Sequence, residues 1–432
     1  MKISIITLGC QLNRSESQRM AYLLKRSGYE IVDNPEGADI VIINTCTVKT
    51  PAENKAFKLL RKYKDKIIIL TGCLVQHQPE LFKDYTLVGV YQIDKIVEAV
   101  ERTLKGERPK YLEIKRINKL KIPSLDQYPI KIIPIQEGCL WQCSYCATKL
   151  ARKLMQSFPP EDVYREIRDA KLKNLRVIWL TGTDLAVYGF DMGLDLADLL
   201  FGIKDIEGLF FIRVGMMNPG IINKFIDKLL RAFEEKRIFK FFHIPVQSGS
   251  NKVLKDMRRG YTIEEFYDLV YKIREKYPEA SIATDIIVGY PTETEEDFKL
   301  TIQMMEEIKF DVVNISRFWP RPKTEAAKLK PLPGHIVKER SRTVTKVFNE
   351  TAKERNKQWL GWKGWVVIES KGTKENSWIG RNYAYKQVIV KSSENLLGKF
   401  VKVEIKDYTA VDLRGKILDV KEQIDIDDWY PF

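Results

Sequence analysis

The stretch KIIPIQEGCLWQCSYC, residues 131–146, joins an apolar strand directly to three closely spaced cysteines. Cys139, Cys143 and Cys146 follow a C-x3-C-x2-C spacing. A loop this tight can hold three thiolates around one site, and three thiolates suit a [4Fe–4S] cluster that keeps one iron open. A structural zinc site prefers four closed ligands, and the loop offers neither a fourth cysteine nor a histidine. The motif therefore predicts an iron–sulfur cluster.

Five further apolar runs follow this strand, separated by amphipathic stretches. They are RVIWLTG (176–182), LFFIRVGM (209–216), FKFFHIPV (239–246), SIATDIIVG (281–289) and DVVNISRF (311–318). Strands that alternate with helices form parallel sheets. Residues 130–356 are therefore predicted to form an open or closed parallel barrel, with the cysteine loop after its first strand.

Residues 1–110 show the same alternation and contain the other three cysteines. Cys10, Cys46 and Cys73 each directly follow an apolar run, namely ISIITLG (3–9), DIVIINT (39–45) and KIIILTG (66–72). The pattern predicts an α/β fold with a doubly wound parallel sheet, whose strands end at one edge where ligands bind. Three cysteines at that edge predict a second cluster. The alternative is three buried structural cysteines.

The remaining segments have different compositions. Residues 111–129 are basic and weakly periodic, which is typical of a linker, and residues 423–432 form an acidic tail. Short strands within residues 357–422 predict a small β-barrel. Aromatic and basic residues mix in this barrel, which favours base stacking and phosphate contacts, and Arg381 is the predicted phosphate-binding residue. The alternative is that many of these aromatic residues fill the barrel core.

The overall composition favours a cytoplasmic protein with a polyanionic partner. The chain has 432 residues, 44% of them hydrophobic, and a formal net charge of +14. No apolar run reaches the roughly 18 residues that span a bilayer, and the N-terminus lacks the pattern of a signal peptide. A basic excess favours nucleic acid as a partner. A lysine- and glutamate-rich surface of the thermophile type is the alternative.

Further motifs resemble two known protein groups. EGCLWQCSYC (137–146) resembles the cysteine loop of the radical S-adenosylmethionine (SAM) superfamily. Five further segments resemble the methylthiotransferase family. They are TLGCQLNRSES (7–17), NTCTVKTPAENK (44–55), TGCLVQ (71–76), HIPVQSGSNKVLKDMRRGYT (243–262) and ATDIIVGYPTETEEDF (283–298). The C-terminal barrel resembles the RNA-binding TRAM domain of that family. The resemblance covers nearly the whole chain.

The resemblance implies two [4Fe–4S] clusters, together with SAM as both methyl donor and radical source. Cys139, Cys143 and Cys146 would hold the radical-generating cluster, and Cys10, Cys46 and Cys73 an auxiliary cluster that carries the sulfur. These six cysteines are the predicted catalytic residues. The implied SAM contacts are Tyr145, Thr181, Gly182, Gln247, Ser248, Asp285, Val288 and Gly289.

The resemblance also implies an activity. The chain is expected to insert a methylthio group at C2 of N6-threonylcarbamoyladenosine at tRNA position 37, with tRNA, SAM, a reductant and a sulfur donor as partners. FIRVGMMNP (211–219) followed by FFHIPVQSGS (241–250) is similar to the archaeal and eukaryotic branch with that substrate.

Three alternatives remain open. They are action on isopentenyladenosine of tRNA, action on an aspartate of a ribosomal protein, and a non-enzymatic iron–sulfur protein for RNA binding or electron transfer. The protein-modifying branch carries Pro-Lys-Asn after its first cysteine, whereas this chain has Gln11-Leu12-Asn13.

Two positions depart from the family pattern. Thr183 stands where a glutamine is usual, and Ala151-Arg152 continues into Lys153-Leu154 instead of Gly-Lys. Neither change alters a cysteine, so substrate geometry is affected more than the cluster-binding pattern.

Overall fold

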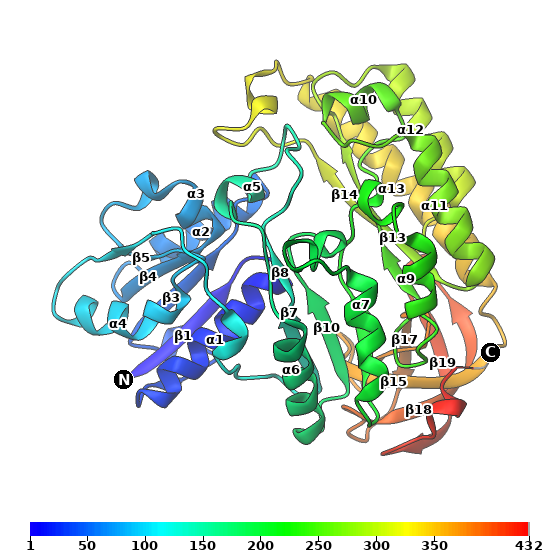
Figure 1. Ribbon diagram of the computed structural model, residues 1–432, viewed down its shortest axis with the longest axis horizontal. Coiled ribbons are helices and arrows are strands. Elements are labelled where there is room, and N and C mark those ends of the chain that lie inside the picture. Colours follow the sequence, from blue (N-terminus) through cyan, green and yellow to red (C-terminus); the bar gives the residue numbers. More distant parts are fainter. Residues whose placement is uncertain (431–432) are drawn as a thin grey trace.

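The computed structural model describes residues 1–430 and begins with a six-stranded parallel sheet (Figure 1). The strand order is β2-β1-β3-β4-β5-β6. The strands are β1 (Lys2–Thr7), β2 (Glu30–Ile31), β3 (Ile40–Thr45), β4 (Ile67–Gly72), β5 (Thr86–Val88) and β6 (Lys110–Tyr111). Residues Ile40 to Ile43 are all fully buried. Because strand side chains alternate, this run buries both faces of the sheet.

Helices cover both of those faces. Helices α1 (Gln11–Arg26) and α4 (Ile96–Leu104) pack on the face that contains Ile40 and Ile42. Helices α2 (Thr50–Lys62) and α3 (Cys73–His77) pack on the face that contains Val41 and Ile43. The predicted doubly wound sheet is thus confirmed.

The central part of the chain forms an open barrel of six parallel strands. Two three-stranded sheets contribute, in the orders β11-β10-β7 and β12-β13-β14. The strands are β7 (Ile130–Pro134), β10 (Val177–Thr181), β11 (Phe211–Val214), β12 (Phe241–His243), β13 (Ser281–Val288) and β14 (Val312–Arg317). Isolated parallel bridges join Ile212 to Ile238 and Met216 to His243, which continues one sheet into the other. Five of the six strands fall within the predicted apolar runs, and β7 begins one residue before its run, at Ile130.

Helices follow these strands and cover the outside of the barrel (Figure 1). They are α6 (Pro160–Leu172), α7 (Leu196–Phe201), α8 (Pro219–Ile222), α9 (Ile226–Ala232), α10 (Asn251–Asp256), α11 (Ile263–Lys276), α12 (Glu295–Ile308) and α13 (Gly334–Lys357). The short helix α5 (Thr148–Ala151) follows the cysteine loop and packs against α3 of the N-terminal unit. The short strands β8 (Gln136–Glu137) and β9 (Gln156–Ser157) pair beside the cysteine loop.

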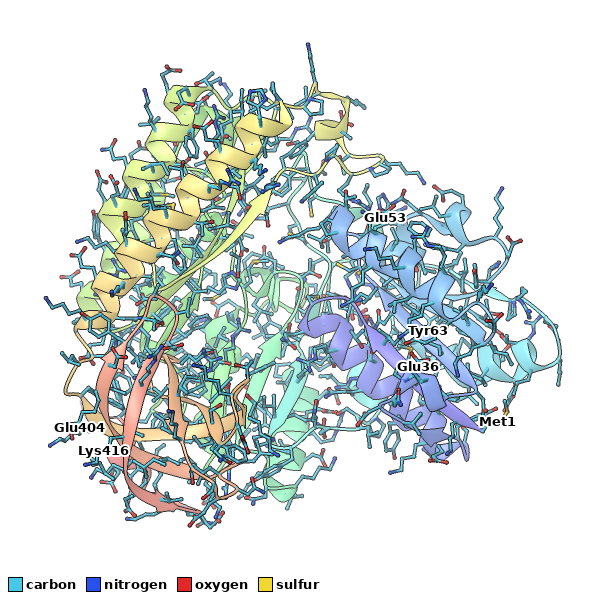
Figure 2. The ribbon with its side chains drawn as sticks, turned by 180° about the vertical axis from the view of Figure 1, so that it is seen from behind. Met1, Glu36, Glu53, Tyr63, Glu404 and Lys416 are labelled. Carbon is cyan, nitrogen blue, oxygen red and sulfur yellow. The ribbon has the colours of Figure 1, made fainter. Side chains whose placement is uncertain are left out.

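A closed five-stranded barrel follows α13, in the order β15-β16-β17-β19-β18. Its strands are β15 (Lys363–Lys371), β16 (Ser377–Arg381), β17 (Gln387–Lys391), β18 (Phe400–Tyr408) and β19 (Leu413–Lys421). Glu404 and Lys416 are register partners on β18 and β19, and both are labelled on the barrel in Figure 2. The predicted small β-barrel is confirmed.

The end of the chain docks against the protein. Trp429 is buried, and its ring centroid lies 4.0 Å from that of Phe211 at the junction of the two barrels. The last two residues, Pro431 and Phe432, lie outside the described part of the predicted tail. No helix within residues 1–430 has the length and apolarity needed to cross a membrane.

The predicted linker is partly integrated into the fold. Strand β6 adds Tyr111 to the N-terminal sheet, and the side chain of Lys119 is fully buried. A buried lysine needs an ionic partner, and Lys119 donates to Glu16 Oε1 at 2.6 Å and also pairs with Glu137. These contacts fix the segment between the N-terminal sheet and the central barrel.

Arg152 completes a buried group of two cations and two carboxylates. Its guanidinium makes two hydrogen bonds to Glu16, of 2.7 and 2.9 Å, and lies 3.4 Å from Glu137. Burial by itself would raise the pKa of Glu16, but Arg152 and Lys119 outweigh burial and hold that pKa below its usual range. Since Glu16 lies on α1 and Arg152 follows α5, this group joins the two large units of the chain.

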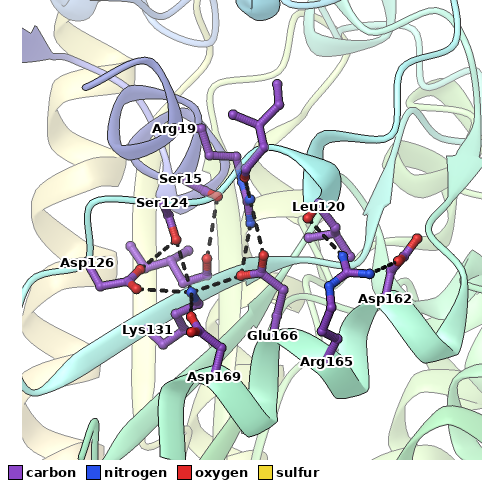
Figure 3. A network of polar contacts seen from close by, with 12 residues as sticks. Ser15, Arg19, Leu120, Ser124, Asp126, Lys131, Asp162, Arg165, Glu166 and Asp169 are labelled. Atoms are coloured by element: carbon purple, nitrogen blue, oxygen red, sulfur yellow. Dashed lines mark hydrogen bonds and ion pairs between the residues drawn. The ribbon is translucent and has the colours of Figure 1, made fainter. Parts of the chain in front are cut away.

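A second ionic network lies nearby (Figure 3). Arg19 on α1 pairs with Glu166 on α6 at 3.4 Å. Lys131 on β7 also pairs with Glu166, at 2.9 Å, and with Asp126 at 3.0 Å. The two networks give the contact between the N-terminal sheet and the central barrel a largely ionic character, which demands accurate geometry.

Replacing Lys119 with Met should destabilise the protein by about 3–5 kcal/mol, because one buried positive charge is lost while both carboxylates remain. Denaturant unfolding measures this change. The double variant Lys119→Met/Glu137→Gln should recover part of the loss. Lys328→Ala, which breaks an exposed pair with Glu325, should change stability by no more than about 0.5 kcal/mol. Equal losses in Lys119→Met and Lys328→Ala would contradict the role of the buried group.

Candidate functional site

The three cysteines of the N-terminal sheet gather around Asn13. Cys10 immediately precedes α1, and Cys73 begins α3 directly after β4. Their Sγ atoms lie 3.4 and 3.8 Å from Asn13 Oδ1. Cys46 follows β3, and it lies near enough to Cys10 and Cys73 for the thiols to affect one another's ionisation. The strand ends therefore bring these cysteines together, as the sequence pattern predicts.

The thiols of this group sit in a desolvated environment that contains a cation. Burial raises the pKa of Cys46, and it raises the pKa of Cys73 to about 12. The guanidinium of Arg152 opposes this rise at both positions. Metal clusters bind the deprotonated thiolate, so Arg152 offers positive charge where bound thiolates would need it.

Asn13 is held rigidly in place. Its Nδ2 donates to Asn44 Oδ1 at 2.7 Å and to the carbonyl of Thr45 at 3.1 Å. A Cβ atom on Gly9 would lie 2.5 Å from Asn13 Cγ, so the chain needs glycine there. The cysteine pattern does not identify Asn13. Its position three residues after Cys10, on the first turn of α1, is the sequence feature that indicates a side chain close to the thiol.

The central cysteine loop also carries charged neighbours. The Sγ of Cys139 lies 3.6 Å from Asp184 Oδ2, and Arg259 Nη1 lies 3.3 Å from the Sγ of Cys143. Burial raises the pKa of Cys139, and Asp184 raises it further. Burial also raises the pKa of Cys146. Asp184 and Arg259 are thus site residues that the cysteine spacing does not identify.

The two departures from the family pattern have structural roles. The hydroxyl of Thr183 accepts a 3.1 Å hydrogen bond from the Gly138 N–H at the start of the cysteine loop. Gln136 Oε1 accepts hydrogen bonds from the N–H groups of Thr183 and Asp184, each at 3.1 Å. A glutamine side chain from β8 therefore contacts the backbone at position 183, where the family pattern has a glutamine of its own. Arg152 belongs to the buried ionic group, whereas Lys153 is exposed.

A cavity of about 370 Å³ lies between the central cysteine loop and the segment that follows Cys46. Val48 and Lys49, which follow Cys46, line one side, and Tyr145 and Cys146 belong to the central loop. Its lining comprises Val48, Lys49, Tyr145, Cys146, Ala147, Thr148, Gln247, Asp285, Ile287, Asn314, Ser316, Arg317, Phe318 and Trp319. Segments from the N-terminal sheet and the central barrel therefore share one hollow.

Three of the eight predicted SAM contacts line this cavity, namely Tyr145, Gln247 and Asp285. Gln247 adopts a positive φ of 76°, and its N–H donates to the Asp285 carbonyl at 2.8 Å. The Asp285 carboxylate lies 3.3 Å from His243 Nε2 and accepts from Asn314 Nδ2 at 2.8 Å. Burial by itself would raise the pKa of Asp285, but His243 and Asn314 outweigh burial and lower it.

The other five predicted SAM contacts lie outside the lining of this cavity. Thr181 and Gly182 stand at the end of β10, where a Cβ on Gly182 would lie 2.7 Å from the Gln136 carbonyl. Ser248 is buried, with its Oγ 3.4 Å from Thr301 Oγ1.

Val288 is the last residue of β13 and Gly289 follows it, directly after the cavity-lining Ile287. Val288 is fully buried, and the Gly289 N–H donates to Glu293 Oε2 at 2.8 Å. Roles for these residues in SAM binding remain predictions.

Arg381 has partners within the protein. Its Nε donates to Glu369 Oε2 at 2.9 Å, and its guanidinium lies 4.5 Å from the Tyr385 ring centroid. Tyr385 is largely buried, and so are Trp359, Trp365, Trp378 and Tyr383. Most of the barrel aromatics thus fill its core, as the structural alternative proposed. A phosphate contact for Arg381 remains a prediction.

Each thiol group has the donor set expected for a three-cysteine cluster. A cation accompanies each group, Arg152 in one case and Arg259 in the other. Within residues 1–430, no three His, Cys, Asp or Glu side chains are arranged to hold a single metal ion. The all-sulfur donor sets and the adjacent cations fit iron–sulfur clusters.

Comparison with protein families divides the chain in the same way as its sheets. Residues 133–305 match the Radical SAM superfamily, and residues 365–418 match the TRAM domain. Residues 2–90 match the uncharacterized protein family UPF0004.

Curated relatives match over nearly the full length. A probable threonylcarbamoyladenosine tRNA methylthiotransferase of Pyrococcus horikoshii is 41% identical over 97% of this chain and 100% of its own. A probable enzyme of the same name from Methanothermobacter thermautotrophicus is 36% identical, with coverages of 96% and 99%. The human threonylcarbamoyladenosine tRNA methylthiotransferase is 36% identical, with coverages of 96% and 74%.

Among solved structures, the radical S-adenosylmethionine methyltransferase TsrM of Kitasatospora setae is similar in fold. Its form with tryptophan substrate and a SAM analogue gives a TM-score of 0.54 at 13% identity, covering 86% of this chain and 79% of its own. At that identity the likeness concerns the fold alone.

Replacing Asn13 with Ala should reduce the iron retained after anaerobic reconstitution to roughly half, which corresponds to loss of one of the two proposed clusters. Loss of a residue that orients metal ligands typically costs 10–100-fold in metal affinity. Iron and sulfide analysis of the desalted protein measures this. Asn395→Ala, at an exposed position of the C-terminal barrel, should keep the full content. Full iron content in both variants would show that Asn13 does not organise the N-terminal thiols.

Proposed function

The chain belongs to the threonylcarbamoyladenosine tRNA methylthiotransferase family, and we propose that it adds a methylthio group to C2 of N6-threonylcarbamoyladenosine at tRNA position 37. One observation supports this most strongly. One cavity is lined both by Cys146 of the central cysteine loop and by Val48 and Lys49, which follow Cys46, and a cation lies beside each cysteine group. A reaction that uses both groups on one substrate requires this arrangement.

We assign Cys139, Cys143 and Cys146 to the cluster that binds SAM, and Cys10, Cys46 and Cys73 to the auxiliary cluster. When bound, these groups supply electron transfer, radical generation and the methylthio group. We further propose that residues 1–110 serve the auxiliary cluster, residues 130–356 the SAM site and residues 357–422 RNA binding, with residues 111–129 as the connecting segment.

The residues of the chain position the reactants and protect them from water. Tyr145, Ile287, Phe318 and Trp319 give the cavity apolar and aromatic walls that suit a planar base. Asp285 is held by His243 and Asn314, so its carboxylate presents a fixed acceptor at the cavity edge. Fixed groups of this kind contribute to rate by holding reacting atoms in alignment.

The polyanionic partner is tRNA in this proposal, which fits the net charge of +14. A reductant and a sulfur donor complete the reaction, and the cytoplasm is the proposed compartment. The competing substrates are isopentenyladenosine of tRNA and an aspartate of a ribosomal protein.

Anaerobically reconstituted protein should convert tRNA that bears threonylcarbamoyladenosine to its methylthio product in the presence of SAM and a strong reductant. Mass spectrometry of the nucleosides measures the product. Cys143→Ala should abolish both product and 5′-deoxyadenosine, whereas Cys46→Ala should abolish product and still release 5′-deoxyadenosine. Lys328→Ala should retain both.

Methylthiolation of isopentenyladenosine or of a ribosomal protein in place of this substrate would refute the proposed specificity. Absence of 5′-deoxyadenosine from wild-type protein with both clusters intact would refute the radical chemistry.

A further inference from the structure

Two cations line the cavity between the central cysteine loop and the segment after Cys46. Lys49 and Arg317 both line it, and both side chains are exposed. Within residues 1–430, the side chains of Lys49 and Arg317 form neither an ion pair nor a hydrogen bond with another side chain. Most other arginines near the site are engaged, as Arg259 is by Tyr261 and Arg321 is by Glu53 (labelled in Figure 2).

Asp285 is the one carboxylate in the lining, and it offsets only one of the two positive charges. It is bound by His243 and Asn314, and Lys49 also lowers its pKa. The cavity therefore has an excess of positive charge. Its remaining lining is mainly apolar and aromatic, which suits a purine with an acidic substituent better than a purine with an apolar one.

The two cations come from different units of the protein, Lys49 from the N-terminal unit and Arg317 from the central barrel. Lys49 is the residue immediately before α2, three residues after Cys46, and Arg317 is the last residue of β14. A group that both side chains reach must lie across the junction of the N-terminal sheet and the central barrel. Because Lys49 follows Cys46 by only three residues, this position lies toward the auxiliary cysteine group, where the proposed function needs the modified base.

We propose that Lys49 and Arg317 bind the carboxylate of the threonylcarbamoyl group and thereby select this substrate over an uncharged N6-modified adenosine. The inference rests on the proposed function and extends it to the residues that determine specificity. Charge-assisted hydrogen bonds to a carboxylate are among the strongest polar contacts in proteins. An isopentenyl group would leave both cations unpaired and partly desolvated, which disfavours it.

Two other anionic groups could meet these cations, namely an RNA phosphate and the carboxylate of SAM. Arg317 also lines a neighbouring hollow with Arg342 and Lys346 on α13, and three cations of this kind suit a phosphate group. The three sources differ in what a substitution changes. Loss of a phosphate contact weakens all stem-loops equally, loss of a SAM contact weakens SAM binding, and only loss of the proposed contact removes the preference for the modified base.

The test uses the anaerobically reconstituted full chain and three anticodon stem-loops, which carry adenosine, threonylcarbamoyladenosine or its methyl ester at position 37. Fluorescence anisotropy gives each affinity, with SAM affinity measured in parallel. Wild type should bind the threonylcarbamoyl stem-loop about tenfold more tightly than either of the others. The variants are Lys49→Met, Arg317→Met, their combination and Arg342→Met, a matched control outside this cavity.

The double variant should bind all three stem-loops within about twofold of one another, with unchanged affinity for SAM, and Arg342→Met should retain the tenfold preference. Lys49→Arg should restore the preference lost in Lys49→Met. A uniform loss across all stem-loops would identify a phosphate contact, and weaker SAM binding would identify a SAM contact; either result overturns the inference. If wild type fails to methylthiolate the threonylcarbamoyl substrate, the proposed function itself fails.

Discussion

The buried ionic group of Glu16, Lys119, Glu137 and Arg152 holds the two cysteine-bearing parts of the protein in a fixed relation. Glu16 belongs to α1, which begins directly after Cys10, and Arg152 follows Cys146 by six residues. Arg152 also lies close enough to Cys73 to affect its ionisation. One set of salt bridges therefore connects both cysteine groups, and the geometry of the shared cavity depends on it.

This arrangement explains why an ionic contact is used where an apolar one would serve stability equally well. Buried ion pairs add little net stability but are highly sensitive to misplacement. Two parallel sheets that each present cysteines at their carboxyl edges must be oriented accurately for those edges to meet at one cavity. The second network, centred on Lys131 and Glu166, constrains the same contact and limits its motion.

Local sequence patterns determine the parts of this architecture that could be predicted. Apolar runs located β1, β3 and β4 of the N-terminal sheet and the strands of the open barrel, and strand-end cysteines located both thiol groups, because each signal lies within a few consecutive residues. The two-residue strand β6 carries no such signal and falls at the start of the predicted linker. Asn13, Asp184 and Arg259 were not identifiable in this way, since their contacts with the cysteines depend on packing. Likewise, the burial of Lys119 within a basic segment depends on carboxylates from other elements.

The partners of several predicted contact residues within the protein could not be read from the sequence either. Ser248 and Gly289 lie within the matching blocks, yet the packed structure directs them toward Thr301 and Glu293. Arg381 sits in a basic region but is bound by Glu369. A sequence motif indicates where in the fold a residue lies, whereas the residue's hydrogen-bond partner depends on the elements that pack beside it.

The most direct test of a shared site is a crystal structure of the anaerobically reconstituted protein with SAM and an anticodon stem-loop bearing threonylcarbamoyladenosine. We expect one cluster on Cys10, Cys46 and Cys73, another on Cys139, Cys143 and Cys146, and the modified base between them in the cavity lined by Lys49 and Arg317. A base bound outside that cavity, or clusters that face separate cavities, would contradict this expectation.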